Sequence, residues 1–473
     1  MLLKYLYNNK KTYLLKFEHI LCVFWIGCLL SVNSKISDLY IADQNPLAIF
    51  LIFIRIAIPT LVFLILIFFL KIKKLDLFNL SYLFFALWQL IILSTNEISS
   101  IAVLEKYHLI ISMIAILLII HIVKYSKFKF LESKLLILST LFIASISFYY
   151  SILNIFEFIK NRELFYLYWN TATMAEGRNL LQTNPRITGI SRMLGLVLFF
   201  IFSIFICKKK KINNLLLIVL MFIISFLLYG MQSKGSYISI FILIIYYIFF
   251  FKEEIKKKIF ISFIILILPI LAYEAVIKIK VYSINKIAFK IIEETNINSS
   301  KIIEETNINS RFFNKHSVVI NGEIQNDYTT GRYEIWSRAL KVIKEKRIFL
   351  GYGPQADRML LGTEIINPHN STKHFYDSNA SNGLIYSYLC AGIIGLLFFL
   401  IIYLLIFLEL YKSIFIKKAF TKKKTNVIFS ILTLTFLTLR TLYENGYALF
   451  GIDLIFATLS YLILQKFNLR GKL

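Results

Sequence analysis

Arginine is scarce in this sequence and unevenly distributed. Only 12 of the 53 basic residues are arginines, and ten of these fall in connections on one side of the apolar segments or near the ends of the segments on that side. The ten are Arg162, Arg178, Arg186, Arg192, Arg311, Arg332, Arg338, Arg347, Arg358 and Arg440. A planar guanidinium can bond two oxygens of one phosphate, whereas the lysine ammonium is a hydrated point charge. The set therefore indicates a phosphate-binding site, with carboxylate pairing and lipid head-group contact as the alternatives for each arginine.

The composition describes the setting in which these arginines must be positioned. Hydrophobic residues make up 58% of the 473-residue chain and the mean hydropathy is +0.70, which is far more apolar than a soluble domain. The net charge of +26 lies in short clusters between apolar runs, as in the connections of a membrane protein, so no nucleic-acid partner is predicted. The four cysteines lie in or beside apolar runs without metal-ligand spacing, which favours small buried side chains.

Twelve segments have about the length needed to cross a bilayer. They lie near 17–33, 47–70, 79–94, 101–123, 133–154, 189–207, 214–229, 235–251, 257–274, 383–409, 426–441 and 446–465. Lysines occupy every second connection and both ends of the chain, which places both termini in the cytoplasm and agrees with an even number of spans. The first segment follows Lys10, Lys11 and Lys16 and lacks a small-residue cleavage site, so we interpret it as an uncleaved signal anchor.

These patterns predict an all-α integral membrane protein of about twelve transmembrane helices. Residues 1–274 would hold helices 1–9, residues 275–382 a periplasmic loop domain, and residues 383–473 helices 10–12 with a cytoplasmic tail. Within the loop, KIIEETNINS at 290–299 recurs at 301–310, and we assign this repeat no function. Tyr333, Trp336, Leu340 and Ile343 recur at helical spacing, which predicts an amphipathic helix near 331–347 that lies on the lipid surface or caps the bundle.

Two ionisable residues fall inside predicted spans. Arg55 and Asp453 would each lie about 11 Å below the outer end of their span, where an unpaired charge is costly. We therefore predict that the two side chains face inward and pair. Arg440 and Glu444, four residues apart, would either pair on one helix face or reach into an outer cavity.

Three stretches of the sequence carry a likeness to a known family. The first is GRYEIWSRALKVIKEKRIFLGYGPQADR, followed by SNGLIYSYLCAGIIGLLFFL with its glycine pair Gly392 and Gly395. The second is NPRITGISRMLGL, which carries Arg186 and Arg192, and the third is the turn QSKGSYISI with Lys234. Together, over roughly residues 180 to 465, they resemble the O-antigen ligase and polymerase superfamily of bacterial inner-membrane glycan transferases.

One position departs from the family pattern. Where the family commonly has a His-Asn pair before the membrane re-entry, this chain has Ser381 and Asn382. Serine does not accept a proton near neutral pH without assistance, so this motif loses a direct claim to acid–base chemistry. His369 and His374 lie a few residues upstream and become the candidate general bases, with a solvated loop side chain as the alternative for each.

The resemblance implies a specific reaction. The enzyme would take a glycan from an undecaprenyl-diphosphate carrier at the periplasmic face of the inner membrane. It would join that glycan to lipid A core, as a ligase, or to a second lipid-linked repeat unit, as a polymerase. No metal or other cofactor is implied, and membrane lipids are the only further partners. The residues implied to hold the diphosphate are Arg186, Arg192, Lys234, Arg332 and Arg440.

A transporter is the competing interpretation, because twelve helices with both ends inside also describe many secondary carriers. Transporters commonly show two similar halves with binding sites at the membrane midplane. Here only the second half carries a long loop, and charges near the midplane are nearly absent. The sequence therefore favours the glycan transferase.

Overall fold

A computed structural model describes most of the helical part of the chain. The described residues are 21–22, 25–27, 29, 57, 60–61, 64, 75–95, 100–125, 130–160, 187–207, 213–230, 234–276, 278, 317–320, 323–326, 332–346, 348–361, 363–366, 373–376 and 380–469. The predicted spans near 17–33 and 47–70 lie outside this part except for single positions. The repeat at 290–310 and Arg55 lie outside it as well.

Ten apolar helices in the described part coincide with ten predicted spans. Seven are long and apolar enough to cross a membrane: α5 (Leu77–Thr95), α6 (Ser100–Tyr125), α7 (Leu131–Lys160), α10 (Ile187–Cys207), the helix Ile255–Val276, α18 (Gly383–Tyr411) and α20 (Ile452–Leu469). Three are shorter: α11 (Asn214–Gly230), α12 (Lys234–Phe250) and α19 (Thr425–Arg440). Such helices fit an integral membrane protein because they satisfy their own backbone groups. The total of twelve and the orientation in the cell stay predictions.

Two helices contain a wider turn. The helix Ile255–Val276 begins as α13 (Ile255–Ser262) and passes through the π-helix η1 (Phe263–Ile267), while the π-helix η2 (Lys412–Ile416) continues α18. Pro269 lacks the N–H group that would bond the carbonyl of residue 265, so the turn before it widens and the N–H of Leu268 bonds Phe263 instead.

The long loop is not purely helical, which corrects the all-α prediction for this part of the chain. It contains α16 (Arg332–Glu345), α17 (Ala356–Leu361) and two antiparallel hairpins, β1 (Ser317–Ile320) with β2 (Glu323–Asn326) and β3 (Thr363–Ile366) with β4 (Lys373–Tyr376). A helix, α16, is present where the amphipathic helix near 331–347 was predicted, and its placement on the lipid surface or over the bundle stays a prediction. Its buried face centres on Ala339, whereas Tyr333 and Leu340 of the predicted apolar stripe are 73% and 59% exposed.

The last predicted span begins six residues later than expected. Residues 446–448 form a single 3₁₀ turn, η3 (Gly446–Ala448), and α20 begins at Ile452. Asp453 is therefore in the first turn of α20 and not 11 Å inside a span. Residues 446–451 are apolar, which led the sequence prediction to include them in the span, but they form a 3₁₀ turn and an irregular segment and not part of the α-helix.

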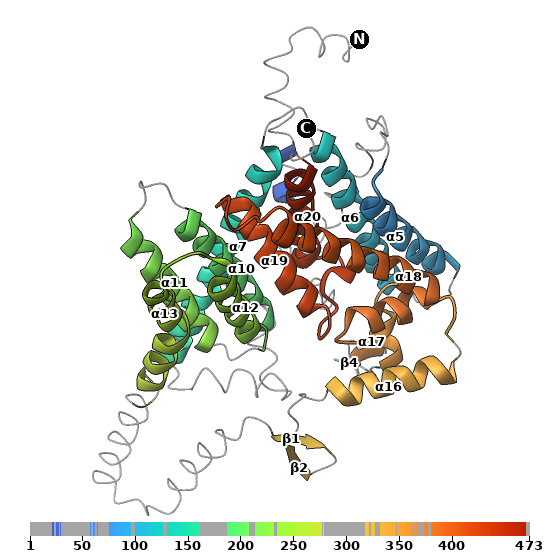
Figure 1. Cartoon of the computed structure of the whole chain (residues 1–473). Helices are drawn as coiled ribbons and strands as arrows, with labels where there is room; N and C mark the ends of the chain where they lie inside the picture. Colours follow the sequence, from blue (N-terminus) through green and yellow to red (C-terminus); the bar gives the residue numbers. More distant parts are fainter. Residues whose placement is uncertain are drawn as a thin grey trace, which may run out of the picture. The chain divides into compact units, whose positions relative to one another are not determined.

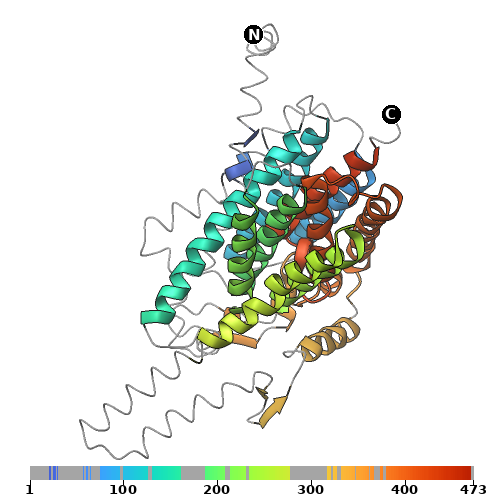
Figure 2. The same ribbon diagram turned by 60° about the vertical axis from the view of Figure 1, so that its left-hand side comes forward.

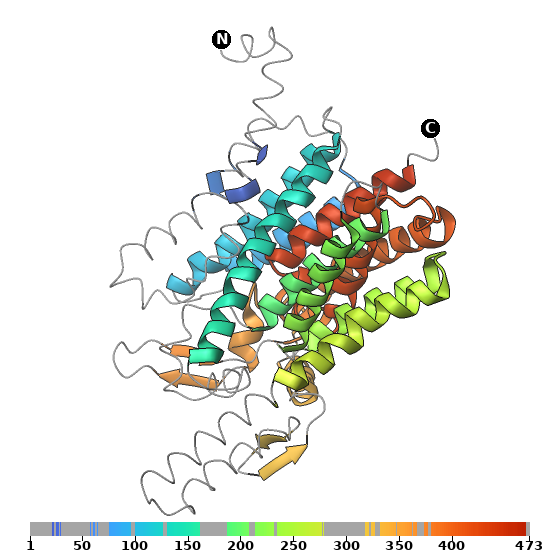
Figure 3. The ribbon, with the colours of Figure 1, turned by 90° about the vertical axis from the view of Figure 1, so that its left-hand side faces the viewer.

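Contacts divide the chain into two compact units. The first combines residues 1–142 with 334–473 and holds α5, α6, α18, α19 and α20, and the second comprises residues 143–333 with α10 to α13. In the second unit α10, α11 and α12 run alongside one another and alongside the α13–η1 helix (Figures 2 and 3). The division predicted from chain order would have separated α5 from α18, which pack against each other.

The lysines predicted to be cytoplasmic gather at one end of the first unit. Lys124, at the end of α6, lies 2.7 Å from Asp76 before α5. Lys466, near the end of α20, lies 2.9 Å from Glu132 at the start of α7. Helices α16 and α17 lie at the opposite end of the unit (Figure 1). Lys124 and Lys466 thus lie at one end of this bundle and α16 and α17 at the other, while the sides of the membrane stay a prediction.

Candidate functional site

Helix α18 is broken at Gly392, whose φ of 62° and ψ of −160° lie outside the helical region. Such a break deprives the carbonyls of the preceding turn of their helical N–H partners, which is costly inside a membrane. The loop before α17 supplies replacements. The N–H of Tyr352 donates to the carbonyl of Leu389 at 3.0 Å, and the N–H of Gly353 donates to that of Cys390 at 2.8 Å.

Two further hydrogen bonds complete this junction. The N–H beyond the break, on Ile393, donates to the carbonyl of Phe349 at 3.0 Å. The indole N–H of Trp88, on α5, donates to the carbonyl of Ala391 at 2.9 Å. The loop, α5 and the first part of α18 are therefore held as one structure, and the Gly-Tyr-Gly-Pro motif is a docking element and not only a helix stop.

Asn382 begins α18 and fastens it to the end of α19. Its side-chain oxygen accepts hydrogen bonds from the N–H groups of Leu384 and Ile385 at 2.9 and 3.1 Å, which makes it the N-cap of the helix. Its side-chain amide donates to the carbonyl of Leu442 at 2.9 Å. The next residue, Gly383, donates its N–H to the carbonyl of Thr441 at 2.8 Å. Asn382 thus positions the start of α18.

Ser381 connects the amphipathic helix to the same place. Its backbone has a positive φ of 44°, and its carbonyl accepts a hydrogen bond from the indole N–H of Trp336 at 3.3 Å. Arg338, one half-turn further along α16, donates to the carbonyl of Leu361 at the end of α17. Helix α16 is therefore attached to both α17 and the entry of α18. Figure 1 shows α16 in yellow next to α17 in orange.

Arg440 forms a buried ion pair with Asp453. Arg440 is the last residue of α19 and Asp453 the second of α20, and they are 7% and 2% exposed. An arginine at a helix C-terminus and a carboxylate at a helix N-terminus both interact favourably with the helix dipoles. The predicted partner of Asp453, Arg55, lies outside the described residues. The sequence offered two alternatives for Arg440, pairing with Glu444 or reaching into an outer cavity, and neither named Asp453 as its partner.

The buried carboxylate of Asp357 forms a third link between the loop and the helices, and this link was not predicted from the sequence. Asp357, in the first turn of α17, is 1% exposed and accepts hydrogen bonds from the N–H of Ala380 at 2.9 Å and the amide of Asn445 at 3.3 Å. A buried carboxylate needs such donors to offset its desolvation. Asp357 therefore joins α17 to the segment before Ser381 and to the α19–α20 connection. The only signal in the sequence was its position three residues after the Gly-Tyr-Gly-Pro motif.

The remaining predicted site residues are distributed over both units. Arg192 is half-buried on α10, and Lys234 is the first residue of α12, both in the second unit. Arg332 is the half-buried first residue of α16. His374 lies on β4 opposite Ile365 of β3. Arg186 and His369 lie outside the described residues. The convergence of these cations on one diphosphate stays a prediction, as does the identity of the base.

Comparison with known protein families gives one match. Residues 216–400 match the family model described as O-antigen ligase. The matched segment runs from α11 through the first half of α18 and includes the docked loop, so it is narrower than the range 180 to 465 that the sequence motifs suggested. No curated protein and no solved structure matches the chain. Residues 216–400 of the chain are thus similar to the O-antigen ligase family, which supports the resemblance to the O-antigen ligase and polymerase superfamily over this part of the chain.

Proposed function

We propose that the protein transfers a glycan from an undecaprenyl-diphosphate carrier to a sugar hydroxyl at the periplasmic face of the bacterial inner membrane. The observation that supports this most is the junction between the loop and α18, which lies inside the matched segment. A lipid-linked donor reaches the site from the membrane and a sugar acceptor reaches it from water. A loop fixed to a broken membrane helix offers both of them one preorganised surface.

In the proposed reaction the acceptor hydroxyl oxygen bonds the anomeric carbon of the donor sugar. The bond from that carbon to the diphosphate oxygen breaks, and its electron pair leaves with undecaprenyl diphosphate. The acceptor proton goes to a base, for which His369 and His374 are the candidates. Charge accumulates on the departing diphosphate, so convergent cations lower the barrier without a requirement for a metal ion.

The cations proposed to contact the diphosphate are Arg186, Arg192, Lys234 and Arg332. Arg440 was included in this set from the sequence, but its guanidinium is buried against Asp453. We therefore propose that Arg440 acts by holding the ends of α19 and α20. Asn382 would likewise be a positioning residue, because its side chain is engaged by three backbone groups.

The test is an assay of purified protein in liposomes with a defined undecaprenyl-diphosphate-linked repeat unit, offered with and without lipid A core. Growth of the lipid-linked chain without core would identify a polymerase, and transfer only to core would identify a ligase. Failure to transfer to either acceptor, combined with movement of the carrier across the liposome membrane, would contradict the enzyme and support the transporter.

A further inference from the structure

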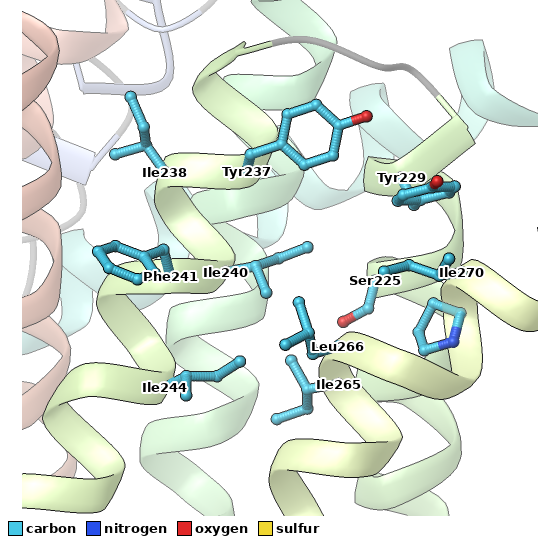
Figure 4. Close-up of a pocket in the computed structure, with 11 residues that line it drawn as sticks. Ser225, Tyr229, Tyr237, Ile238, Ile240, Phe241, Ile244, Ile265, Leu266 and Ile270 are labelled. Atoms are coloured by element: carbon cyan, nitrogen blue, oxygen red, sulfur yellow. The ribbon is translucent and has the colours of Figure 1, made fainter.

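The loop that docks on α18 carries two adjacent apolar side chains that the described residues leave exposed. Phe349 and Leu350 are 64% and 53% exposed, although the backbone of each is hydrogen-bonded to an apolar helix. Phe241 on α12, an apolar helix of the second unit, is exposed to the same extent as Phe349 (Figure 4). Such exposure is favourable where a side chain faces lipid and costly where it faces water.

The depth of this loop in a membrane follows from the length of α5. The helix has 19 residues, so it is about 28 Å long and only just crosses the apolar layer of a bilayer, which is about 30 Å thick. Asp76, which pairs with Lys124, directly precedes the first residue of α5 and marks one edge of that layer. The other edge therefore lies near Thr95, the last residue of the helix.

Trp88 holds the loop below this second edge. It lies seven residues before Thr95, which is about 10 Å along the helix axis. Its indole N–H also donates to the carbonyl of Leu350 at 3.3 Å. Gly353 lies one turn nearer the end of α5, where a Cβ atom on it would be 3.9 Å from the backbone of Leu93. The loop thus descends along α5 from Gly353 to Leu350.

The face of α5 that Leu350 joins is the face that lipid would cover. Phe84 and Ile91 lie on the same side of the helix as Trp88, four residues before it and three residues after it, and both are exposed apolar side chains. The ring of Phe84 stacks on that of Phe398 of α18 at 5.4 Å. The exposed apolar surface therefore continues across both helices, and the loop extends it.

A non-helical segment is tolerated at membrane depth only where protein groups bond its backbone. The carbonyls of Phe349 and Leu350 both accept hydrogen bonds, and the N–H groups of Tyr352 and Gly353 both donate them to α18. Pro354, the next residue, has no N–H group to satisfy. The segment therefore meets this requirement where it contacts the two helices.

The charges beside the loop fit the level of the lipid head groups. Lys344, in the last turn of α16, and Lys346, directly after that helix, are both exposed. Lys346 precedes Phe349 by three residues, a separation of at most about 10 Å. A lysine at this distance can reach lipid phosphates while the phenyl ring lies among acyl chains.

We propose that the side chains of Phe349 and Leu350 are inserted among the acyl chains of the leaflet at this end of the first unit. The lysine pattern of the sequence predicts that this is the periplasmic leaflet. The loop would then be a membrane anchor that holds the C-terminus of α16 at the head groups. The inference concerns the contact with the bilayer and does not depend on glycan transfer. A second protein chain over the two side chains is the competing occupant.

The experiment places a nitroxide spin label on single cysteines of the full-length, otherwise cysteine-free protein in phosphatidylcholine nanodiscs. Collisions of the label with oxygen report hydrocarbon, and collisions with a water-soluble nickel chelate report water. The ratio of oxygen to chelate collisions at Phe349→Cys and Leu350→Cys should match that at Leu397→Cys, an exposed position on α18. It should exceed the ratio at Lys422→Cys, in the exposed turn before α19, at least about fivefold, because a polar chelate is excluded from hydrocarbon.

Two results would overturn the proposal. Chelate access at Phe349→Cys equal to that at Lys422→Cys would show that the loop lies in water. Protection of Phe349→Cys from both reagents would show that protein covers it.

A second measurement covers the case in which the cysteine-free protein does not fold. The photoreactive residue p-benzoylphenylalanine then replaces Phe349, Leu397 or Lys422 in the otherwise unchanged protein. Mass spectrometry after illumination should find acyl-chain adducts at the first two positions and none at the third. An adduct at Leu397 without one at Phe349 would refute the proposal.

A matched pair of variants tests the same contact without a probe. Phe349 and Leu340 are both exposed apolar residues, but Leu340 lies on α16 beside the exposed Lys341. A carboxylate among acyl chains is costly, so Phe349→Asp should lower the yield of folded protein at least about fivefold. Leu340→Asp should stay within about twofold of the unchanged protein, because a carboxylate at the head groups or in water stays hydrated. Equal yields of the two variants would contradict insertion of Phe349.

Discussion

A side chain on Gly351 would collide with the backbone around Gly392, and a side chain on Gly392 would collide with the backbone just before Gly351. A Cβ atom on Gly351 would lie 2.6 Å from the backbone nitrogen of Gly392, and one on Gly392 would overlap the carbonyl oxygen of Phe349. Both glycines have positive φ, 94° and 62°. The close approach allows the loop to bond the carbonyls that the break in α18 exposes. The two glycine motifs of the sequence are therefore the two sides of one contact.

Gly392→Ala should separate the loop from α18. The added methyl meets backbone atoms, which cannot rotate away, and the conformation at this residue is one that alanine adopts only with strain. We expect a loss of about 2 kcal/mol or more of stability and little or no glycan transfer, measured by thermal unfolding in detergent and by the transfer assay. Gly451→Ala is the control, because no atom lies within 4 Å of the methyl group that alanine would add there. Equal stability and equal transfer activity of the two variants would contradict the close contact between the loop and α18.

The pair of Arg440 and Asp453 should be tested as a double-mutant cycle. Removal of one partner leaves a buried charge, so Arg440→Gln and Asp453→Asn should each cost about 3–5 kcal/mol. The double variant should cost clearly less than the sum, as read from thermal unfolding. The exposed pair of Lys341 and Glu345 on α16 is the control, with an expected cost for Lys341→Ala below about 0.5 kcal/mol. Strict additivity at Arg440 and Asp453 would show that they do not stabilise each other.

Two substitutions distinguish the helix cap that Asn382 provides for α18 from its hydrogen bond to the carbonyl of Leu442. Asn382→Ala loses both the helix cap and the bond to Leu442, at a cost of about 1–2 kcal/mol. Asn382→Asp keeps the cap but replaces the amide donor near Leu442 with a carboxylate oxygen that repels its carbonyl. Both variants should lose stability, and both should retain part of the transfer activity in proportion to the folded fraction. Full stability with no activity in either variant would instead indicate direct contact with the substrate.

The geometry of the proposed diphosphate contact is tested by Arg332→Lys, which keeps the charge and removes the planar fork. We expect the transfer rate to fall at least about tenfold, since a charge-assisted bidentate bond is lost. Arg338→Lys on the same helix is the matched control, because Arg338 bonds a backbone carbonyl that lysine can also reach. A wild-type rate in Arg332→Lys would remove Arg332 from the diphosphate site.

The parts of the structure that the sequence predicted are those governed by hydropathy alone. Spans of about 20 apolar residues have one dominant solution in a bilayer, and α5, α18 and α19 begin within about two residues of their predicted starts. The start of α20 was missed because residues 446–451 are apolar and packed but turn at Gly446, which has a positive φ of 51°. A hydropathy window does not register such a turn.

Contacts between distant residues could not be predicted from one sequence. The pairing of Arg440 with Asp453 crosses the α19–α20 connection, whereas spacing arguments consider only neighbours on one helix, such as Glu444. The contact of Gly351 with Gly392 joins positions whose motifs were each noticed, but nothing in either motif specifies the other as its partner. The buried role of Asp357 depends on two residues, Ala380 and Asn445, from separate segments.

The most direct test of the account is the mass balance of the reaction catalysed by the purified protein. With an undecaprenyl-diphosphate-linked repeat unit, an acceptor and an excess of EDTA, each glycan joined should release one undecaprenyl diphosphate that retains both phosphates. That result would establish the bond that breaks and the absence of a metal requirement together. An absolute need for a divalent cation, or a product in which the transferred glycan still carries a phosphate, would contradict the proposed transfer.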